Sequence, residues 1–318
     1  MNITVILCTY NRANCIGSAL GSVLASALPS GFEWEVLVVD NNSKDHTRAV
    51  IDEFCQRHPT RVRYIFESQQ GLSNARNAGI REARGEIIAF TDDDVSVERT
   101  WLHNLTCSLH DGTCVGAGGR VCPPHNFVPP DWLTLDGSIM DSSGVLALFN
   151  DGNVAGILKK PPFGANMAFH KSMFAKYGGF RPDLGRCGNN LMGNEDTEFG
   201  TRLLAGGERL RYEPAAIVYH PVSKERLNTK YFLSWWFAYG RAMYRQAGKR
   251  APIWGIPRPY VSLLSRTVRW LAASPFHPKE RFYWKCRVWV AAGELSEMNS
   301  AQQQDESRPQ PKTLLAGK

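Results

Sequence analysis

Short apolar runs alternate with amphipathic segments over the first ninety residues of the chain. Runs with the length of buried strands lie at 3–7, 35–39, 62–66 and 87–90. Segments with helical spacing lie between them, at 16–28, 45–54 and 71–83. Strands that alternate with helices in this way indicate right-handed βαβ units. The pattern therefore predicts an α/β fold, with a mostly parallel, Rossmann-like central sheet flanked by helices.

The pattern is less regular after residue 101. Further strands are predicted at 115–121 and 216–219, and a helix is predicted to end near Leu204. Residues 122–160 contain several Pro-Pro and glycine positions, so they are expected to form loops. The glycine- and asparagine-rich segment 183–193 is expected to be a mobile loop that could close over a ligand.

Polar side chains follow the predicted strands. Thr9, Asn11 and Arg12 come after the first strand, and Asp40 comes after the second. Asp92–Asp94 come directly after the fourth strand. In a parallel sheet these positions meet at one edge, where ligands bind. A single aspartate in such a place is usually a helix cap, but several at one edge favour a binding site.

The three consecutive aspartates are the strongest candidate for a metal site. Asp92 and Asp94 point to one side if the chain stays extended, with Asp93 opposite. Adjacent carboxylates are costly to bury, and a pair of them suits Mg²⁺ or Mn²⁺ bound together with phosphates. The alternative is a solvated turn or an N-cap cluster for a following helix. Because no glycine-rich phosphate loop follows the first strand, a nucleotide would be held by side chains and a metal.

Three later segments contain candidate catalytic or ligand-binding residues. Glu195 and Asp196 open a predicted helix, either as cap residues favoured by the helix dipole or with one as a general base. His220 follows the last predicted strand, either as a structural residue or as a ligand. Gly164 and Ala165 are small enough to let a ligand approach the backbone, or they form a tight turn.

Composition and charge divide the chain near residue 221. The 318 residues are 43% hydrophobic, which suits a globular protein with a sizeable core. From residue 221 onward 17 Lys and Arg face 6 Asp and Glu, whereas the first 220 residues hold 20 against 24. The eight cysteines form no C-x-x-C pair, and no signal peptide or 18-residue apolar stretch is found. These features predict a cytoplasmic protein with free thiols.

The basic segment also carries six of the nine tryptophans. Residues 223–298 are predicted to form amphipathic helices that mix tryptophan with arginine and lysine. These helices could pack on the preceding domain, or they could bind an anionic membrane surface at the inner face of the cell membrane. No nucleic-acid-binding motif is present, so nucleic acid is not expected as a partner. The polar segment 299–318 is predicted to be disordered.

An ordered series of motifs runs from residue 2 to about 222. The motifs are TYNR at 9–12, VVDNNS at 38–43, GLSNARNAG at 71–79, FTDDD at 90–94, GANMAF at 164–169, NEDTEF at 194–199 and YHP at 219–221. In this series the chain resembles family 2 glycosyltransferases with the GT-A fold.

The resemblance implies which residues contact the donor nucleotide. Thr9, Asn11 and Asp40 match positions near the base and ribose. Arg76 matches a position near the nucleotide and its phosphates. Asp92 and Asp93 match positions that approach the ribose and diphosphate.

The resemblance also implies a metal site, a base and a sugar pocket. Asp94 matches the principal ligand of Mg²⁺ or Mn²⁺, and His220 matches the histidine that completes the metal or diphosphate site in some members. Asp196 matches the catalytic base. The segment that lines the sugar and acceptor pocket is matched by Gly164, Ala165 and Asn166, with Glu195 beside it.

The implied activity is transfer of a sugar from a nucleotide sugar, with inversion, to a glycan or lipid-linked acceptor. A UDP-sugar is the favoured donor, with GDP- and dTDP-sugars as alternatives, and the implied role is cell-surface polysaccharide or glycolipid biosynthesis. No Q-x-x-R-W signature is present, which favours addition of a single sugar. A nucleotidyltransferase and a catalytically silent membrane-associated scaffold are the alternative functions.

The predicted domains follow from the same motifs and the charge boundary. A GT-A catalytic domain is expected over 1–222, with a nucleotide-sugar half over about 1–115 and an acceptor half over about 116–222. The helical extension is expected over 223–298, and the disordered tail follows it.

Overall fold

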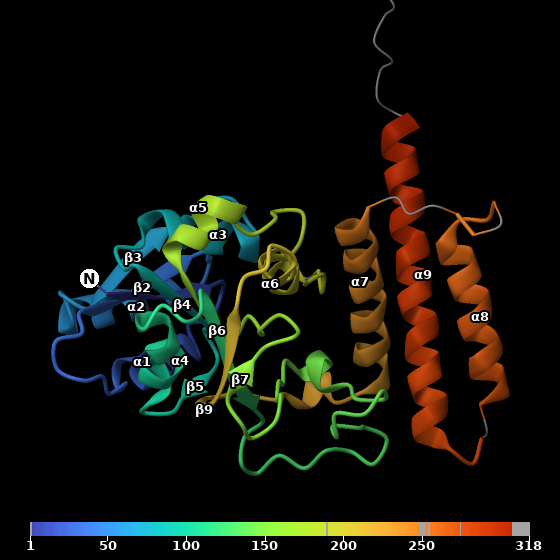
Figure 1. Cartoon of the computed structure of the whole chain (residues 1–318), viewed down its shortest axis with the longest axis horizontal. Coiled ribbons are helices and arrows are strands. Elements are labelled where there is room, and N and C mark those ends of the chain that lie inside the picture. The colour runs from blue at the N-terminus through green and yellow to red at the C-terminus, as the bar shows by residue number, and fades with distance from the viewer. Residues whose placement is uncertain (1, 189, 249–251, 254, 274, 307–318) are drawn as a thin grey trace, which may run out of the picture. The chain divides into compact units, whose positions relative to one another are not determined.

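A computed structural model describes residues 2–188, 190–248, 252–253, 255–273 and 275–306 (Figure 1). The chain forms two compact units, Met1–Phe232 and Leu233–Lys318. The first unit contains the central sheet, and the second consists of helices.

The first unit is built on one mixed, mostly parallel sheet. Its strand order is β3-β2-β1-β4-β8-β6-β9-β5, with β7 paired to β9. Strands β3, β2, β1 and β4 are parallel, β8 runs antiparallel to both β4 and β6, and β6 is parallel to β9. The strands are β1 (Ile3–Thr9), β2 (Trp34–Asp40), β3 (Val62–Phe66), β4 (Ile87–Asp92), β5 (Ser96–Val97), β6 (Gly116–Cys122), β7 (Gly156–Ile157), β8 (Asn166–His170) and β9 (Leu210–Tyr219).

Helices cover both faces of this sheet (Figure 1). One core cluster includes residues of α1, α2 and α4, and the other includes residues of α3, α5 and α6. These helices are α1 (Ile16–Leu24), α2 (Thr47–Arg57), α3 (Leu72–Glu82), α4 (Trp101–His110), α5 (Lys171–Tyr177) and α6 (Glu195–Ala205). Short 3₁₀ helices lie at η1 (Ser143–Leu146) and η2 (Lys224–Arg226).

Strand β2 shows why the central positions of the first strands are apolar on both faces of the sheet. Val36 and Val38 belong to one core cluster, and Leu37 and Val39 belong to the other. Because successive side chains alternate between the two faces and both faces are covered, all four side chains are fully buried. The predicted α/β fold with helices on both faces is confirmed.

The second unit contains most of α7 (Thr229–Ala247), α8 (Arg258–Ala272) and α9 (Pro278–Glu306). The backbones of α7 and α9 approach closely at two glycines. A Cβ on Gly240 would collide with the carbonyl of Val290, and a Cβ on Gly293 would collide with the carbonyl of Phe237. This reciprocal contact fixes how the two helices pack.

Two buried or half-buried ion pairs join the same helices. Glu297 accepts hydrogen bonds from Arg241 Nε at 2.9 Å and from Arg245 Nε at 2.8 Å. Helix α9 continues to Glu306, so the prediction of disorder from residue 299 is wrong for its first part. Alanine, glutamine and glutamate are good helix formers, and they extend a helix that is already nucleated. Residues 307–318 lie outside the described residues.

Among the residues that the structure describes, no helix is both long enough and apolar enough to cross a lipid bilayer.

Candidate active site

The carboxyl ends of β1, β2 and β4 lie next to one another. In the parallel register Thr9 is the partner of Asp40, and Cys8 is the partner of Asp92. The polar residues that follow these strands therefore meet at one edge of the sheet. This placement follows directly from the parallel pairing that the sequence pattern predicts.

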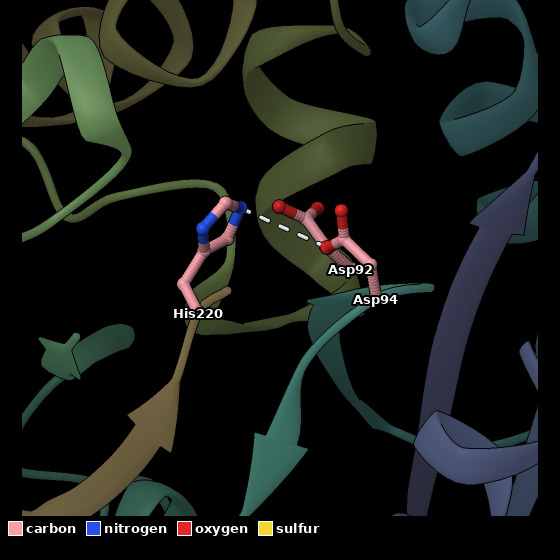
Figure 2. Close-up of side chains that lie close together, drawn as sticks. All are labelled: Asp92, Asp94 and His220. Carbon is pink, nitrogen blue, oxygen red and sulfur yellow. Dashed lines mark ion pairs between the residues drawn. The ribbon is translucent and has the colours of Figure 1, made fainter. Parts of the chain in front are cut away.

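Strand β9 brings His220 to the same edge, because β5 links the aspartates to β9. Ser96 pairs with Tyr219, so Asp94 and His220 leave this short ladder side by side. One potential ligand atom from each of Asp92, Asp94 and His220 lies within 4.8 Å of the others. His220 Nε2 is 3.7 Å from Asp94 Oδ1, and the ring nitrogen points toward both carboxylates (Figure 2).

The donor set of these three residues suits Mg²⁺ or Mn²⁺. Two carboxylates and one imidazole fill part of an octahedral shell and leave positions for phosphate oxygens and water. Burial raises the pKa of Asp92 and lowers the pKa of His220, although the opposite charges nearby act against both shifts. Both shifts show that this site disfavours isolated charges, and a bound divalent cation would stabilise the ionised carboxylates.

A buried ion pair connects this group to α6. Arg76 on α3 donates from Nη1 to Glu195 Oε1 at 2.5 Å. The two side chains are 4% and 5% exposed, respectively. Arg76 Nη2 lies 3.9 Å from Asp92 Oδ1 and donates to the carbonyl oxygen of Gly164 at 3.4 Å. Arg76 therefore joins β4, α6 and the turn before β8. Glu195 holds this arginine, and its place beside the sugar pocket remains a prediction.

Asp196 lies on the other side of the same turn. Its Oδ2 accepts the backbone N–H of Gly164 at 2.7 Å, and its Oδ1 accepts the N–H of Thr197 at 2.6 Å. A Cβ on Gly164 would lie 2.7 Å from Arg76 Nη2 and 2.8 Å from Asp196 Oδ2. A larger residue at this position would displace the end of the Arg76 or the Asp196 side chain. The half-buried Asp196 carboxylate is therefore held in one orientation near Arg76.

Two of the predicted pocket residues are instead part of the core. Asn166 is fully buried. Its Nδ2 donates to the carbonyls of Arg120 at 2.9 Å and Ala216 at 2.8 Å, and its Oδ1 accepts from Trp101 Nε1 at 2.8 Å. Its amide is thus used to join β8 to β6, β9 and α4, so the prediction that Asn166 lines a pocket is wrong. Ala165 is 2% exposed and cannot line a pocket with its side chain.

The residues that are predicted to contact the base and ribose lie at the ends of β1 and β2 and in the loop after β1. Asp40 accepts hydrogen bonds from the Ser43 N–H at 2.9 Å and the Tyr64 hydroxyl at 3.1 Å. Asn11 is exposed, has a left-handed φ of 52°, and accepts the Lys44 N–H at 2.7 Å. Thr9 is buried at the end of β1. These residues lie on the predicted edge, and their contacts with a nucleotide remain a prediction.

Arg12 is a further site residue to which the sequence reasoning gave no role. Its Nε lies 3.7 Å from Asp93 Oδ1, and its Nη2 lies 3.8 Å from Asp94 Oδ2. Burial raises the pKa of Asp93 to about 7, and the charge of Arg12 acts against this rise. The position of Arg12 in the polar turn after β1 could have predicted its contact with the aspartates, since β1 and β4 are parallel neighbours.

The segment 183–193 lies beside the site and is tied to the start of α3. The N–H of Leu72 donates to the carbonyl of Arg186 at 2.8 Å, and Ser73 Oγ donates to the carbonyl of Leu184 at 2.8 Å. The charge of Arg186 acts against the raised pKa of Asp92. Closure of this segment over a donor remains a prediction, and residue 189 lies outside the described residues.

Comparison with known proteins agrees with this architecture. A solved structure of the mannosyltransferase PcManGT from Pyrobaculum calidifontis, in complex with GDP-Man and Mn²⁺, superposes with a TM-score of 0.60 at 20% identity. The match covers 93% of this chain and 87% of that one. This likeness supports the GT-A type of fold.

Two curated relatives match most of the chain. The succinoglycan biosynthesis protein ExoM of Rhizobium meliloti is 24% identical over 252 residues, which is 79% of this chain and 77% of the relative. A glucosyl-dolichyl phosphate glucuronosyltransferase of Haloferax volcanii is 26% identical over 252 residues, which is 76% of each chain.

The family model described as glycosyl transferase family 2 matches residues 4–176, which is more than half of the chain. This segment contains β1 to β4, the three aspartates, Arg76 and the turn at Gly164. The chain belongs to glycosyl transferase family 2, and it is a glycosyltransferase.

Proposed function

We propose that the protein is an inverting, metal-dependent transferase that moves one sugar from a nucleoside-diphosphate sugar to a hydroxyl group of a glycan or lipid-linked acceptor. One observation carries this proposal. The Asp92, Asp94 and His220 group and the Asp196 carboxylate lie at one sheet edge, where Arg76 lies close to both. A cation site and a base are the two parts that this reaction needs.

The first part would serve the leaving group. Asp94, His220 and Asp92 are the residues that would hold Mg²⁺ or Mn²⁺, which supplies Lewis-acid compensation of the charge on the departing diphosphate. Arg12 lies near Asp93 and Asp94, and Arg186 is near enough to influence Asp92. These arginines would add positive charge where the phosphates bind.

The second part would serve the acceptor. The Asp196 carboxylate is oriented by two backbone N–H groups, and its remaining lone pairs can accept the proton of an acceptor hydroxyl. Such a base contributes roughly 10²–10⁴-fold to the rate. Attack of the hydroxyl oxygen on the anomeric carbon opposite the diphosphate breaks the sugar–phosphate bond in a single displacement, so the configuration inverts.

The donor and acceptor classes come from the relatives. The similar mannosyltransferase structure contains GDP-Man with Mn²⁺, so GDP-sugars belong beside the favoured UDP-sugars, with dTDP-sugars as a further class. The two curated relatives are named for succinoglycan biosynthesis and for transfer to glucosyl-dolichyl phosphate. We therefore propose a role in cell-surface polysaccharide or glycolipid biosynthesis.

The test measures release of nucleoside diphosphate from a panel of UDP-, GDP- and dTDP-sugars. EDTA should abolish release, and added Mn²⁺ or Mg²⁺ should restore it. Asp196→Asn should lower turnover by roughly 10²–10⁴-fold while nucleotide binding survives. Glu53→Gln, whose side chain is 72% exposed on α2, is the matched carboxylate-to-amide control and should transfer normally.

Three outcomes would contradict the proposal. Normal transfer by Asp196→Asn would remove the base assignment. Release of pyrophosphate when a nucleoside triphosphate and a sugar 1-phosphate are supplied together would favour the nucleotidyltransferase alternative. Failure to bind any of the nucleotides with Mn²⁺ would favour the silent scaffold.

A further inference from the structure

Helix α8 exposes a row of large apolar side chains. Tyr260, Leu264, Val268 and Leu271 are 46%, 68%, 56% and 70% exposed. They are spaced by four, four and three residues, so they lie on one face of the helix. We call these four residues the apolar stripe. Exposed leucines at this spacing are unusual on the surface of a helix that already has a packed face.

The opposite side of α8 packs within its own unit. Arg266 donates to the carbonyl of Arg287 at 3.1 Å and lies 3.9 Å from Glu294, and both partners are on α9. Arg269 lies over the ring of Trp284 at 5.0 Å. Because α9 already covers the side of α8 that carries Arg266, the apolar stripe does not serve the core that these two helices share.

Apolar exposure continues at both ends of the helix. Ile256, just before α8, is 48% exposed, and Phe276, in the link to α9, is 88% exposed. Within the described part of the chain, half of the exposed large apolar side chains lie from Ile256 to Phe276, these two included. The apolar surface is therefore concentrated on one segment and is not scattered over the protein.

The charge of the same segment is strongly positive. Residues 256–281 contain five basic residues and one acidic residue, Glu280. Lys279 and Arg281 are exposed in the first turn of α9, close in sequence to Phe276. An apolar face bordered by cations complements a surface that combines acyl chains with negative headgroups. A second copy of the chain fits less well, because a symmetric contact would bring these like charges together.

We propose that the apolar stripe, together with Phe276, docks the helical unit on an anionic lipid bilayer. In this arrangement α8 lies in the plane of the interface, with the stripe at the boundary of the acyl chains and with Lys279 and Arg281 among the phosphates. The proposal goes beyond sugar transfer, since docking requires neither donor nor acceptor. It would place the enzyme where a lipid-linked acceptor is found.

The test is flotation of the full chain with phosphatidylcholine vesicles, with and without phosphatidylglycerol. Binding is expected only when phosphatidylglycerol is present. Leu264→Ser combined with Leu271→Ser should lower the vesicle partition coefficient by about tenfold or more, since two leucines no longer enter the apolar region. Val128→Ser combined with Ile139→Ser is the matched control, because these side chains are 81% and 82% exposed in the first unit. That variant should bind as the parent does.

A second pair of variants tests the charges. Lys279→Gln and Arg281→Gln should each lower binding by about fivefold, and added salt should reduce the difference. Asp196→Asn should bind vesicles normally, so failure of docking can be distinguished from failure of the proposed chemistry. The side chains substituted in the helical unit are exposed, and unchanged thermal unfolding should show that these variants fold.

Other results would overturn the proposal. Equal binding to neutral vesicles would show that the anionic headgroups play no part. No binding to either kind of vesicle would show that the apolar stripe does not bind lipid, and it would favour a protein as its partner. A dimer in solution that dissociates in the Leu264→Ser and Leu271→Ser variant, without vesicle binding, would identify a second copy as the occupant.

Discussion

The two units of the chain concentrate their unfavourable groups in different ways. The sheet-containing unit buries Asp93, Glu195 and Arg76 around the candidate site, whereas the helical unit, which buries Glu297, exposes two leucines on one face of α8. Burying a charge and exposing a large apolar side chain both lower stability when the protein is alone. Each arrangement becomes favourable when a binding partner completes it. The comparison shows that the position of an unfavourable group indicates the chemistry of the missing partner.

The ion pairs of the two units differ in the same way. The side chains of the Arg76–Glu195 pair are only 4% and 5% exposed, and the pair lies at the candidate site. The pairs of Glu297 with Arg241 and Arg245 leave each arginine 30% exposed and join two helices. The first pair is expected to serve the site as well as the fold, and the second is expected to serve the fold only. Four substitutions sharpen this contrast.

Asp94→Asn should have the largest effect, and only on activity. Loss of the proposed principal cation ligand should lower turnover on the order of a thousandfold. Stability without metal should change little, because the repulsion between Asp94 and the adjacent carboxylates opposes its attraction to Arg12. Steady-state assays with Mn²⁺ and thermal unfolding without it measure the two effects. Asp111→Asn, a fully exposed carboxylate, is the control. A large loss of stability would mean that the aspartates hold the fold together.

Glu195→Gln should affect both properties. The substitution leaves the Arg76 guanidinium buried without its anionic partner, which should lower the free energy of unfolding by about 3 kcal/mol. Arg76 would also lose its fixed position near Asp92, so kcat should fall while binding of the free nucleotide changes less. Denaturant unfolding and separate measurements of kcat and KM test this. Loss of stability with unchanged kcat would show a purely structural pair.

Gly164→Ala should lower turnover by up to about a hundredfold. The added Cβ would press on Arg76 Nη2 and Asp196 Oδ2, and a displacement of about 1 Å is enough for such a loss. Ala substituted at Gly144, where a Cβ would meet nothing within 4 Å, is the matched control. Equal activity of the two variants would contradict the role of the turn in orienting Asp196.

Glu297→Gln should have the smallest effect. It is the same chemical change as Glu195→Gln, but both arginines can turn toward water, so the loss should be about 1–2 kcal/mol. Turnover of a soluble acceptor should be unchanged. The difference between the two variants in the same unfolding assay measures how much the buried environment adds. Equal losses of stability would remove the contrast between the units.

The sequence pattern predicts the parallel half of the sheet well, because burial on both faces makes the inner positions of β1, β2 and β4 apolar. The run at 62–66 coincides with β3, and the run at 87–90 lies within β4. The pattern does not reveal β5 or β7, which have two residues each and pair only through β9. Such short ladders are stabilised by tertiary contacts and leave no periodic signal.

The site is partly readable in the same way. The strand-end rule places Asp40 and the three aspartates correctly at one edge, and it also brings in His220. It fails at Asn166, because a motif does not show whether an amide faces a pocket or the core. That distinction depends on Trp101 and Ala216, which are distant in the sequence. The strand-end rule also gives no role to Arg12, because its contacts with Asp93 and Asp94 depend on the side-chain conformation.

The late position of β9 in the chain determines when the proposed metal group is completed during synthesis. Strands β1 to β4 are complete early, so the nascent chain can build the parallel half soon after it leaves the ribosome. His220 emerges only after β9, long after Asp94. A partly made chain could therefore be well folded in its first half and still lack the third member of its metal group. Sugar transfer is therefore expected only after β9 has joined the sheet.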